Sequence, residues 1–454
     1  MELPSFSDTC AFVRSLDKPS VSDQLRSARR DGKVIVQPRC GVGDHRDMLQ
    51  LLTTLQDEAQ PDVLTLTIDS YSRLRMFEKA AALLRSDPRA LNGYPLVAQG
   101  WRMGRDLNLR TRLPLDIRHG SPLSDKLFEV AIASGITSFE GGGISYNLPY
   151  AKNVPLEASL ASWRRIDRRC GELAEEGIIV AREMFGTLTA VLIPPSLSIA
   201  VTLLEAISAA QEGARCIEIA YPQGGNVIQD VAALKSIRIL AQRYLPEEIE
   251  VYAVLHQYMG PFPKDPVKAK ALIVLGGLVA KLGGAEKIVT KTHEEAYGIP
   301  TARANVEGIL LTKYALSSLF SLIQVDPGLV EEEMCWIERE VAELIEPLLS
   351  GSNLDQTIIT AFQEGKLDLP FSPSINTRNA VIPMRNGLGA IRYLTAGLLP
   401  FSERSKSRNN QSIAFSKAAK DQAEKIVEDV GYFTEGSGIY AQGRHGFVRD
   451  TGAT

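Results

Sequence analysis

Short apolar segments alternate with longer segments of helical periodicity over the first two thirds of the chain. In one helical segment, Met48, Leu51, Leu52 and Leu55 recur at the spacing of a single helix face. The apolar segments are mostly continuous rather than alternating, which is typical of parallel strands covered on both faces. Nine of them are predicted as strands: VIVQPR (34–39), VLTLTI (63–68), PLVAQG (95–100), PLDIRH (114–119), ITSFE (136–140), IIVARE (178–183), CIEIAY (216–221), EVYAVLH (250–256) and KIVTK (287–291).

The alternation of strands and helices predicts a parallel α/β fold. A (β/α)8 TIM barrel has eight strands, so one of the nine predicted strands is expected to be accessory or incorrect. Beyond about residue 306 the strand signal fades; helices are predicted at 306–324, 329–350, 355–364 and 413–430, with a polar surface linker at 402–412 and a Gly-rich tail. We therefore expect an N-terminal segment (1–33), a TIM barrel (34–310) and a mainly helical, loop-rich C-terminal extension (311–454).

Composition and charge narrow the class of protein. Apolar residues make up 44% of the 454 residues and charged residues 23%, as in ordinary globular proteins. The net charge of −4 provides no overall basic field for nucleic acid. No signal peptide is recognisable, and the most apolar run, 271–280, is too short to span a membrane. Five scattered cysteines without a CxxC pair favour a reducing cytoplasm, and no metal ligands are predicted.

Ionisable residues stand at or just after the ends of the predicted strands. Because the carboxyl ends of the strands of a TIM barrel meet at its catalytic face, these side chains are expected around one mouth. Charged residues also follow buried strands simply because the chain turns to solvent there. The glycine-rich loops RCGVG (39–43), EGGG (140–143) and GGN (224–226) favour the site over that alternative, because glycine lets the backbone approach a ligand. The residues concerned are Arg39, Arg73, Arg118, Glu140, Arg182, Glu183, His256 and Lys291.

Three arginines around one cavity indicate anion binding. A guanidinium group presents a planar fork that matches the two oxygens of a carboxylate. Arg39, Arg73 and Arg118 would suit a small substrate with two carboxylates, and Glu140 would suit its ammonium group. The segment 138–154 also supplies tyrosine hydroxyls, at Tyr146 and Tyr150 among others. The pattern favours an acidic amino acid; phosphate esters stay open on charge alone, although no P-loop or GxGxxG motif is present.

The chain resembles a known family, the epsilon (E) subunits of methylaspartate mutase, also called glutamate mutase. The resemblance extends from about residue 34 to about residue 400. The blocks that carry it are PRCGVG (38–43), LTIDSYSR (66–73), PLDIRHG (114–120), EGGGISYNLPYAKNV (140–154), REMFG (182–186), LIPPS (192–196), GGNVIQD (224–230), HQYMG (256–260), KTHEEAYGIPT (291–301), LPFSPS (369–374) and PMRNGLGAIRYL (383–394).

The resemblance implies a TIM barrel that binds glutamate through an arginine claw. The matching positions are Arg39, Arg73 and Arg118, with Glu140 at the substrate ammonium as the expected catalytic residue. The family's two substrate-lining tyrosines match Tyr146 and Tyr150. A lysine and a glutamate that hold the adenosyl ribose match Lys291 and Glu295, and His256 is expected near the corrin. The implied reaction is the radical isomerisation of L-glutamate to L-threo-3-methylaspartate with adenosylcobalamin.

The resemblance also implies a partner. In this family a small sigma subunit with a DxHxxG motif carries the cobalamin, and two large and two small subunits form a heterotetramer. The chain itself has no DxHxxG motif; the nearest string, GDHRD (43–47), fails the spacing. The cofactor is therefore expected at an interface over the barrel mouth, shared with a separate polypeptide.

The sequence departs from the family at three places beside the expected site. Residue 139 is Phe where the family usually has Asn, His293–Glu294 replaces a Pro-His pair, and the GECGN loop reads PQGGN (222–226). Three alternatives remain open: a mutase for a related acidic amino acid, a cobalamin-independent lyase or aldolase that uses Lys291 as a Schiff base, and a non-catalytic scaffold.

Overall fold

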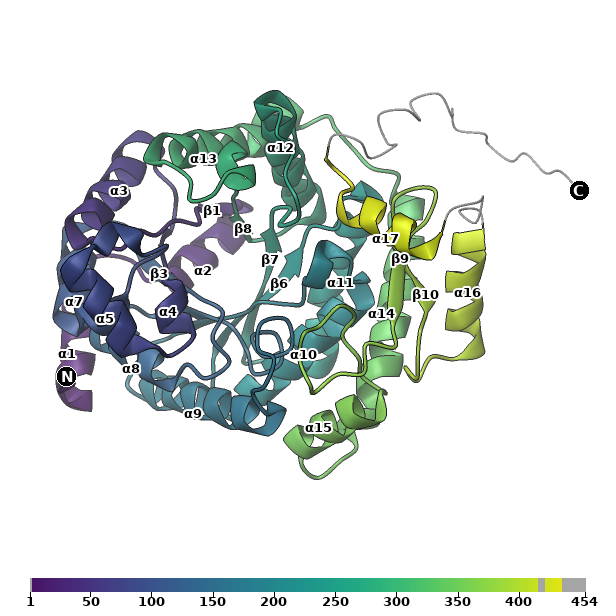
Figure 1. The fold of residues 1–454 in the computed structure, drawn as a ribbon, viewed down its shortest axis with the longest axis horizontal. Coiled ribbons are helices and arrows are strands. Elements are labelled where there is room, and N and C mark those ends of the chain that lie inside the picture. The colour runs from purple at the N-terminus through teal and green to yellow at the C-terminus, as the bar shows by residue number, and fades with distance from the viewer. Residues whose placement is uncertain (1, 415–420, 435–454) are drawn as a thin grey trace, which may run out of the picture.

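The structure, a computed structural model, describes residues 2–414 and 421–434. Its centre is an eight-stranded parallel sheet in the order β1-β8-β7-β6-β5-β4-β3-β2, curved into a barrel (Figure 1). This confirms the predicted (β/α)8 architecture. The strands are β1 (Ile35–Gln37), β2 (Leu64–Thr67), β3 (Leu115–Arg118), β4 (Ser138–Glu140), β5 (Ala181–Met184), β6 (Cys216–Pro222), β7 (Glu250–His256) and β8 (Lys287–Val289).

The ninth predicted strand, 95–100, is wrong: it forms the short helix α6 (Leu96–Gln99) in the connection between β2 and β3. Leu96 and Val97 are buried, and Gly100, with a φ of 83°, separates α6 from α7 (Trp101–Arg110). A short apolar run has the same pattern in a buried strand and in a buried helical turn, so periodicity could not separate the two.

The barrel has a seam between β1 and β2, the two ends of the strand order. No ladder joins these two strands in the described chain. Irregular hydrogen bonds bridge the seam: among them, Asp62 N–H donates to Val36 O (3.0 Å), Val36 N–H donates to the Asp62 carboxylate (2.8 Å), and Thr67 N–H donates to Cys40 O (2.9 Å). The Thr65 hydroxyl also donates to Pro38 O (2.7 Å) and accepts from the Gln37 amide (2.9 Å). The wall is therefore nearly closed, but its first two strands are joined less regularly than the others.

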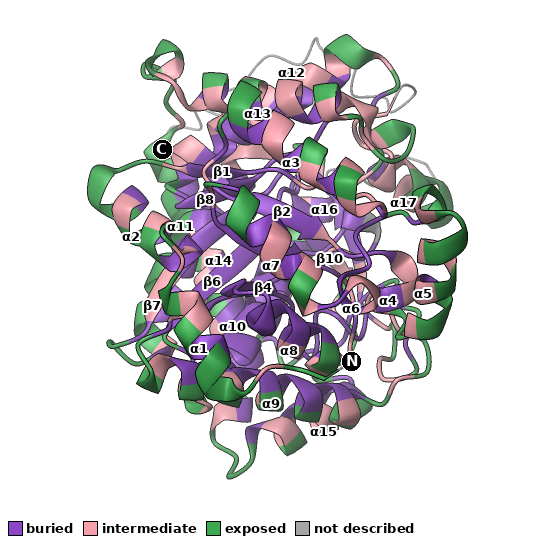
Figure 2. Cartoon of the chain, turned by 90° about the vertical axis from the view of Figure 1, so that its left-hand side faces the viewer, coloured by how far each residue is buried: buried purple, intermediate pink, exposed green. Residues whose placement is uncertain are grey.

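Helices surround the strands, and burial follows this layering: the strands are buried while the helices expose their outer faces (Figure 2). Helix α3 contains the predicted stripe, with Met48, Leu51, Leu52 and Leu55 all buried. The N-terminal segment forms two helices that the sequence did not reveal. The helices up to the end of the barrel are α1 (Phe6–Arg14), α2 (Val21–Asp31), α3 (His45–Glu58), α4 (Ser70–Arg73), α5 (Phe77–Ser86), α8 (Asp125–Ala133), α9 (Leu156–Glu175), α10 (Pro195–Gln211), α11 (Val227–Tyr244), α12 (Pro266–Gly283) and α13 (Ala302–Leu316).

The C-terminal part packs against one side of the barrel (Figure 1). Helices were predicted in this region, and α14 and α15 match two of them. The hairpin β9–β10 was missed, and the predicted linker 402–412 is wrong because these residues form α16, whose Ser405 and Asn409 are buried. Residues 415–420 of the predicted last helix and the predicted Gly-rich tail lie outside the described residues. The elements are α14 (Pro327–Leu349), α15 (Leu354–Glu364), β9 (Ile382–Arg385), β10 (Ile391–Thr395), α16 (Glu403–Ala414) and α17 (Gln422–Val430).

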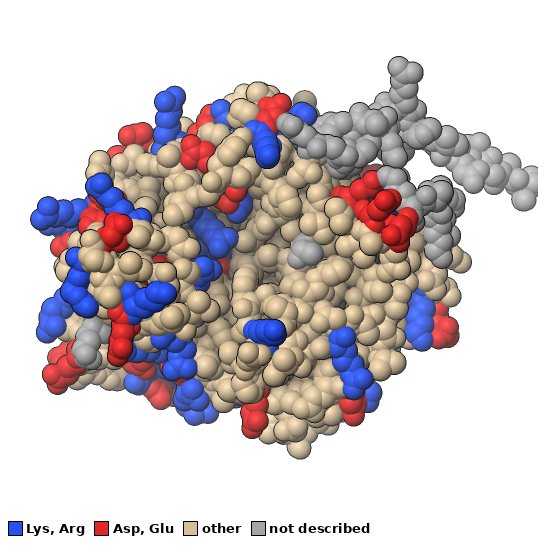
Figure 3. All heavy atoms as spheres, in the orientation of Figure 1, with Lys and Arg blue, Asp and Glu red and all other residues tan. Residues whose placement is uncertain are grey.

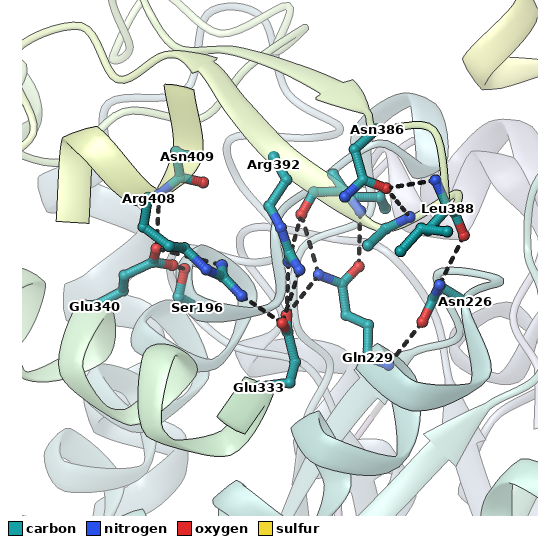
Figure 4. Close-up of polar contacts among 12 residues, drawn as sticks. Ser196, Asn226, Gln229, Glu333, Glu340, Asn386, Leu388, Arg392, Arg408 and Asn409 are labelled. Atoms are coloured by element: carbon teal, nitrogen blue, oxygen red, sulfur yellow. Dashed lines mark hydrogen bonds and ion pairs between the residues drawn. The ribbon is translucent and has the colours of Figure 1, made fainter. Parts of the chain in front are cut away.

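A buried polar network fastens this part to the barrel helices (Figure 4). Glu333 of α14 accepts hydrogen bonds from Arg392 of β10 (2.6 and 2.7 Å) and from Gln229 of α11 (3.0 Å). Ser196 of α10 donates to Glu340 of α14 (2.6 Å). The C-terminal part is thus tied by directional bonds to the helices that stand behind β5 and β6. No helix in the described residues is both long and apolar enough to cross a membrane.

Candidate active site

A pocket opens at the mouth formed by the carboxyl ends of the strands, with about 390 Å³ of space that includes its opening to solvent. Figure 3 shows a hollow at the centre of the barrel with Lys and Arg atoms inside it. The pocket brings together seven of the residues predicted from the sequence. Its lining is Arg39, Arg73, Arg118, His119, Glu140, Tyr150, Phe185, His256, Gln257, Met259, Val289 and Lys291.

Arg118, at the end of β3, is buried and fully engaged with carboxylates. It binds Glu183 of β5 through two parallel hydrogen bonds (2.7 and 3.1 Å). It also donates to Glu140 of β4 and, at 3.3 Å, to Asp116 two residues earlier on its own strand. Burial opposes the charge, but the three carboxylates raise the pKa of Arg118 further above its usual range. The guanidinium group of Arg118 therefore has a fixed orientation before any ligand binds.

Glu140 is placed between Arg118 and Tyr146, which both donate hydrogen bonds to its carboxylate. Burial raises the pKa of Glu140 to about 7, although Arg118 works against this shift. The pKa of Tyr146 is raised by burial and by Glu140, so the phenol keeps its proton and acts as a donor. A carboxylate that ionises near pH 7 and lines a pocket is suited to receive an ammonium group.

Below the pocket, charged side chains from several strands meet inside the barrel. Lys287 of β8 forms ion pairs with Glu183 (2.7 Å) and with Glu218 of β6. Glu183 has a pKa well below its usual range, because Arg118 and Lys287 outweigh the effect of burial. Burial raises the pKa of Glu218 to about 7 against the pull of Lys287. The network thus holds Glu183 charged and Arg118 in place.

His256, at the end of β7, joins this network from the pocket wall. Burial lowers the pKa of His256 to about 4, so the imidazole is neutral at pH 7. The ring Nε2 lies 2.6 Å from Glu183 and 2.8 Å from Arg118 Nη2. With its proton on Nε2, the ring donates to the ionised Glu183. Nδ1 is then a buried acceptor without a partner among the described residues. A bound ligand with an N–H or O–H group can satisfy it.

Arg39 and Arg73 differ from Arg118, because neither has an ion pair or a side-chain hydrogen bond among the described residues. Arg39 follows β1, and Arg73 ends the short helix α4 after β2. Burial, together with the neighbouring charge of Arg39, lowers the pKa of Arg73. Nε of Arg73 is buried without a partner. Two adjacent guanidinium groups without an anion make a site for a carboxylate.

Aromatic side chains form the wall beside Glu140. Tyr146 packs edge-on to Tyr150 (5.8 Å between ring centres) and against Phe185 (5.1 Å) and His119 (4.8 Å). Tyr150 remains 41% exposed at the rim. The wall therefore excludes water from the inner side of the pocket and leaves the outer side open.

Lys291, just after β8, is buried and forms an ion pair of 2.5 Å with Glu295, which lies in the short 3-10 helix that follows (His293–Ala296). Burial lowers the pKa of Lys291 against the effect of Glu295. The pair supplies one hydrogen-bond donor group and one acceptor group side by side, which suits a ligand with vicinal hydroxyls.

Two of the departures from the family pattern are not themselves part of the pocket lining. Phe139 is buried, packs edge-on against Phe128 (5.1 Å) and lies against the lining residue His119 (4.9 Å between ring centres). Glu294 accepts from the backbone N–H of Thr301 (2.7 Å), which fixes the loop after β8. Arg182 also faces outward, where it binds Asp167 of α9 (2.7 Å).

Ligand atoms of Glu140, Glu183 and His256 lie within 4.8 Å of one another, as in a metal site. However, Arg118 donates to both carboxylates. The guanidinium occupies the position of a cation, and this arrangement serves an organic ligand better than a metal ion.

Sequence reasoning missed the inner half of this site. Asp116, Glu218 and Lys287 all lie inside apolar strands, and Glu183 was noticed at a strand end without a role. The available signal was a charged residue in the middle of an apolar run, Glu218 in CIEIAY and Asp116 in PLDIRH. Those charged residues of barrel strands that face inward need charged partners on other strands.

Comparison with known proteins places these features in one family. The family model described as methylaspartate mutase E chain (MutE) matches residues 17–438. The glutamate mutase epsilon subunit of Escherichia coli O157:H7 is 39% identical over 410 residues, 88% of this chain and 85% of that protein. The epsilon subunit of Haloarcula marismortui is 39% identical over 393 residues (85% and 80%), and that of Yersinia enterocolitica is 38% identical over 447 residues (94% and 92%).

Solved structures are less similar. N-(5'-phosphoribosyl)anthranilate isomerase from Pyrococcus furiosus aligns over 62% of this chain and 99% of that chain, with 12% identity and a TM-score of 0.33. Neither the fold assignment nor the site rests on so distant a likeness.

Proposed function

This chain belongs to the methylaspartate mutase E chain family, and from this premise we propose that it is the catalytic subunit of a glutamate mutase. The reaction is the isomerisation of L-glutamate to L-threo-3-methylaspartate. The observation that carries the substrate is the contrast among the arginines. Arg39 and Arg73 line the pocket without an anionic partner among the described residues, whereas Arg118 already forms an ion pair with Glu140.

Glutamate matches this division of charge. Arg39 and Arg73 would take one carboxylate, Arg118 would take the other, and the ionised Glu140 would take the ammonium group. When the ammonium group and a carboxylate of the substrate enter between Glu140 and Arg118, the ion pair between these two residues is replaced by one ion pair from each of them to the substrate. Glu183 remains on Arg118 and keeps its fork in place during this exchange.

The residues present also fit adenosylcobalamin, which supplies the radical that removes hydrogen from the substrate. Lys291 and Glu295 would hold the adenosyl ribose hydroxyls, and His256 offers its unpartnered Nδ1 on the inner wall. The aromatic wall of Tyr146, Tyr150 and Phe185 shields the substrate from water.

The cobalamin itself is proposed to arrive on a separate small sigma subunit with a DxHxxG motif. None of the four histidines in the described chain is exposed. Exposed apolar side chains on segments that follow the barrel strands provide a surface for such a partner. Leu74 and Met76 follow β2, Val267 follows β7, and Tyr297 and Ile299 follow β8. Two large and two small subunits would form the heterotetramer.

The test is to mix the chain with the cobalamin-binding subunit encoded nearby, adenosylcobalamin and glutamate, and to follow 3-methylaspartate by proton NMR. Each component is omitted in turn. Product that requires all four supports the mutase and the two-chain site together. Turnover without adenosylcobalamin would instead indicate a lyase based on Lys291, and glutamate binding without product would indicate a related acidic substrate.

A further inference from the structure

A second buried carboxylate lies close to the site but outside the pocket. Glu205 is the only acidic residue of α10, a helix buried along almost its whole length. Its carboxylate accepts three hydrogen bonds from one short loop: from the backbone N–H of Ile144 (2.7 Å), from that of Ser145 (2.7 Å) and from the hydroxyl of Ser145 (2.9 Å). No ion pair to Glu205 occurs in the described residues, so these three donors are what satisfies its buried charge.

The loop and the carboxylate fit together because of a glycine. A Cβ atom at Gly142 would overlap the carboxylate of Glu205. The neighbouring Gly141 has a φ of 117°, and a Cβ there would overlap the ring of Tyr146. The two glycines let the loop fold back on both sides, toward the helix and toward the pocket.

This loop carries the groups that define the inner end of the pocket. It begins directly after Glu140 and includes Tyr146, whose hydroxyl donates to Glu140. Tyr146 is the residue next to Ser145, and its N–H donates to the carbonyl of Gly142 (3.1 Å). A displacement at Ser145 is therefore passed directly to the phenol that orients Glu140.

Helix α10 is itself held from the far side. Ser196, at its first turn, donates to Glu340 (2.6 Å; Figure 4). Its hydroxyl also lies 2.9 Å from the hydroxyl of Tyr393. Glu205 is thus a fixed acceptor on a helix anchored to the C-terminal part.

From this arrangement we propose that Glu205 is a positioning residue, which holds the loop 141–147 so that Glu140 and Tyr146 recognise the ammonium group of the substrate. The proposal rests on the function proposed above for the identity of that substrate. It predicts that Glu205 matters for the ammonium end of glutamate and not for its carboxylates, which are bound by arginines on other loops.

The test compares Glu205→Gln with the matched control Glu212→Gln. Glu212 caps the same helix but binds Arg164 (3.0 Å) away from the loop. Both backbone N–H groups donate to one carboxylate oxygen, and the Ser145 hydroxyl donates to the other. In Glu205→Gln the neutral amide oxygen accepts more weakly from the two N–H groups, and the Ser145 hydroxyl has to turn round to accept from the NH2 group.

Calorimetry with the full chain would measure the affinity for glutamate and for glutarate, which lacks the ammonium group. We expect Glu205→Gln to weaken glutamate binding about tenfold, the effect of replacing charge-assisted loop bonds with neutral ones, and to leave glutarate binding within about twofold. Glu212→Gln should change neither. Equal losses for both ligands would mean that Glu205 only supports the fold and would overturn the proposal.

Hydrogen exchange of the Ile144 and Ser145 amides gives a readout that does not depend on the substrate. In Glu205→Gln these amides should exchange at least about tenfold faster than in the parent, while peptides of α10 stay protected. Unchanged exchange would refute the positioning role even if the parent chain makes methylaspartate. If the amides exchange faster in Glu205→Gln but the parent chain binds neither glutamate nor glutarate, the result would count against the proposed function alone.

If Glu205→Gln fails to fold, Ser145→Ala keeps Glu205 and both backbone bonds and removes only the hydroxyl donor. It should weaken glutamate about threefold without affecting glutarate, the loss expected for one neutral hydrogen bond. No difference between the two ligands in this variant would contradict the proposal.

Discussion

Glu183 binds Arg118 with both carboxylate oxygens, at 2.7 and 3.1 Å, from the strand next to that of Glu140. Lys287 and His256 support the same carboxylate from below and from the wall. Arg118 therefore has two kinds of acidic partner. Glu140 can change partner when a ligand enters, and Glu183 is fixed by its other contacts.

The first prediction concerns this fixed partner. Glu183→Gln keeps the shape but removes a charge that two buried cations share, so we expect the free energy of unfolding to fall by about 3 kcal/mol. Urea unfolding followed by circular dichroism would measure it. Glu176→Gln, which breaks the exposed pair with Arg14, is the control and should cost at most about 1 kcal/mol. A loss as small for Glu183→Gln would show that Glu183 is not ionised in the folded chain.

The second prediction separates binding from stability. Arg73→Met removes a cation with no anionic partner among the described residues and close to Arg39, so the chain should keep or gain stability. The affinity for glutamate should drop about 10- to 150-fold, the range for one charge-assisted hydrogen bond. Arg75→Met, at an exposed neighbour outside the pocket, is the control. Unaltered glutamate affinity in Arg73→Met would remove Arg73 from the claw.

The third prediction follows from the pKa of Glu140, about 7 in the ligand-free chain. Below this pH the carboxyl holds a proton that it must release before it can bind an ammonium group. The affinity for glutamate should therefore rise about tenfold per pH unit up to pH 7 and then level off. Calorimetry at pH 5.5 to 8 would show it, with about one proton released per ligand at the acid end.

Two controls accompany this pH profile. Glutarate, without an ammonium group, should lack the rise assigned to Glu140. Glu140→Gln should bind glutamate more weakly and with a flatter profile. A steep rise that persists in Glu140→Gln would assign the titration to another group.

The fourth prediction separates cofactor from substrate. Lys291→Gln removes the cation of the Lys291–Glu295 pair at the outer end of the pocket. In the assembled enzyme, the concentration of adenosylcobalamin needed for half-maximal activity should rise about tenfold, as expected for one lost charge-assisted bond. Glutamate binding by the chain alone should change much less. Lys270→Gln, in a surface pair with Glu307, serves as the control, and the reverse pattern would place Lys291 on the substrate.

The outer half of the site could be predicted from the sequence because barrel strands end at the mouth. Arg39, Arg118 and Glu140 each follow or close a recognisable apolar run, so their position along the chain already places them together. The resemblance to glutamate mutases, confirmed by the family match, added their roles as expectations. Those roles remain predictions that the variants above test.

The inner half depends on which way a side chain points, and strand patterns do not give that directly. Glu218 and Lys287 face each other only because β6 and β8 lie on either side of β7 and the sheet is curved. The positioning contact of Glu205 was equally hidden, because it joins a helix to a loop 60 residues earlier in the chain. Long-range contacts between polar groups of this kind leave no periodic signal.

The seam between β1 and β2 has a consequence for the barrel wall when a substrate binds. Arg39 follows one of these strands and Arg73 the other, so the two arginines without anionic partners stand on opposite sides of the least regular joint in the wall. One carboxylate bound by both guanidinium groups would join the segments after β1 and β2 across this joint. The substrate itself would then complete the part of the wall that backbone hydrogen bonds hold least regularly.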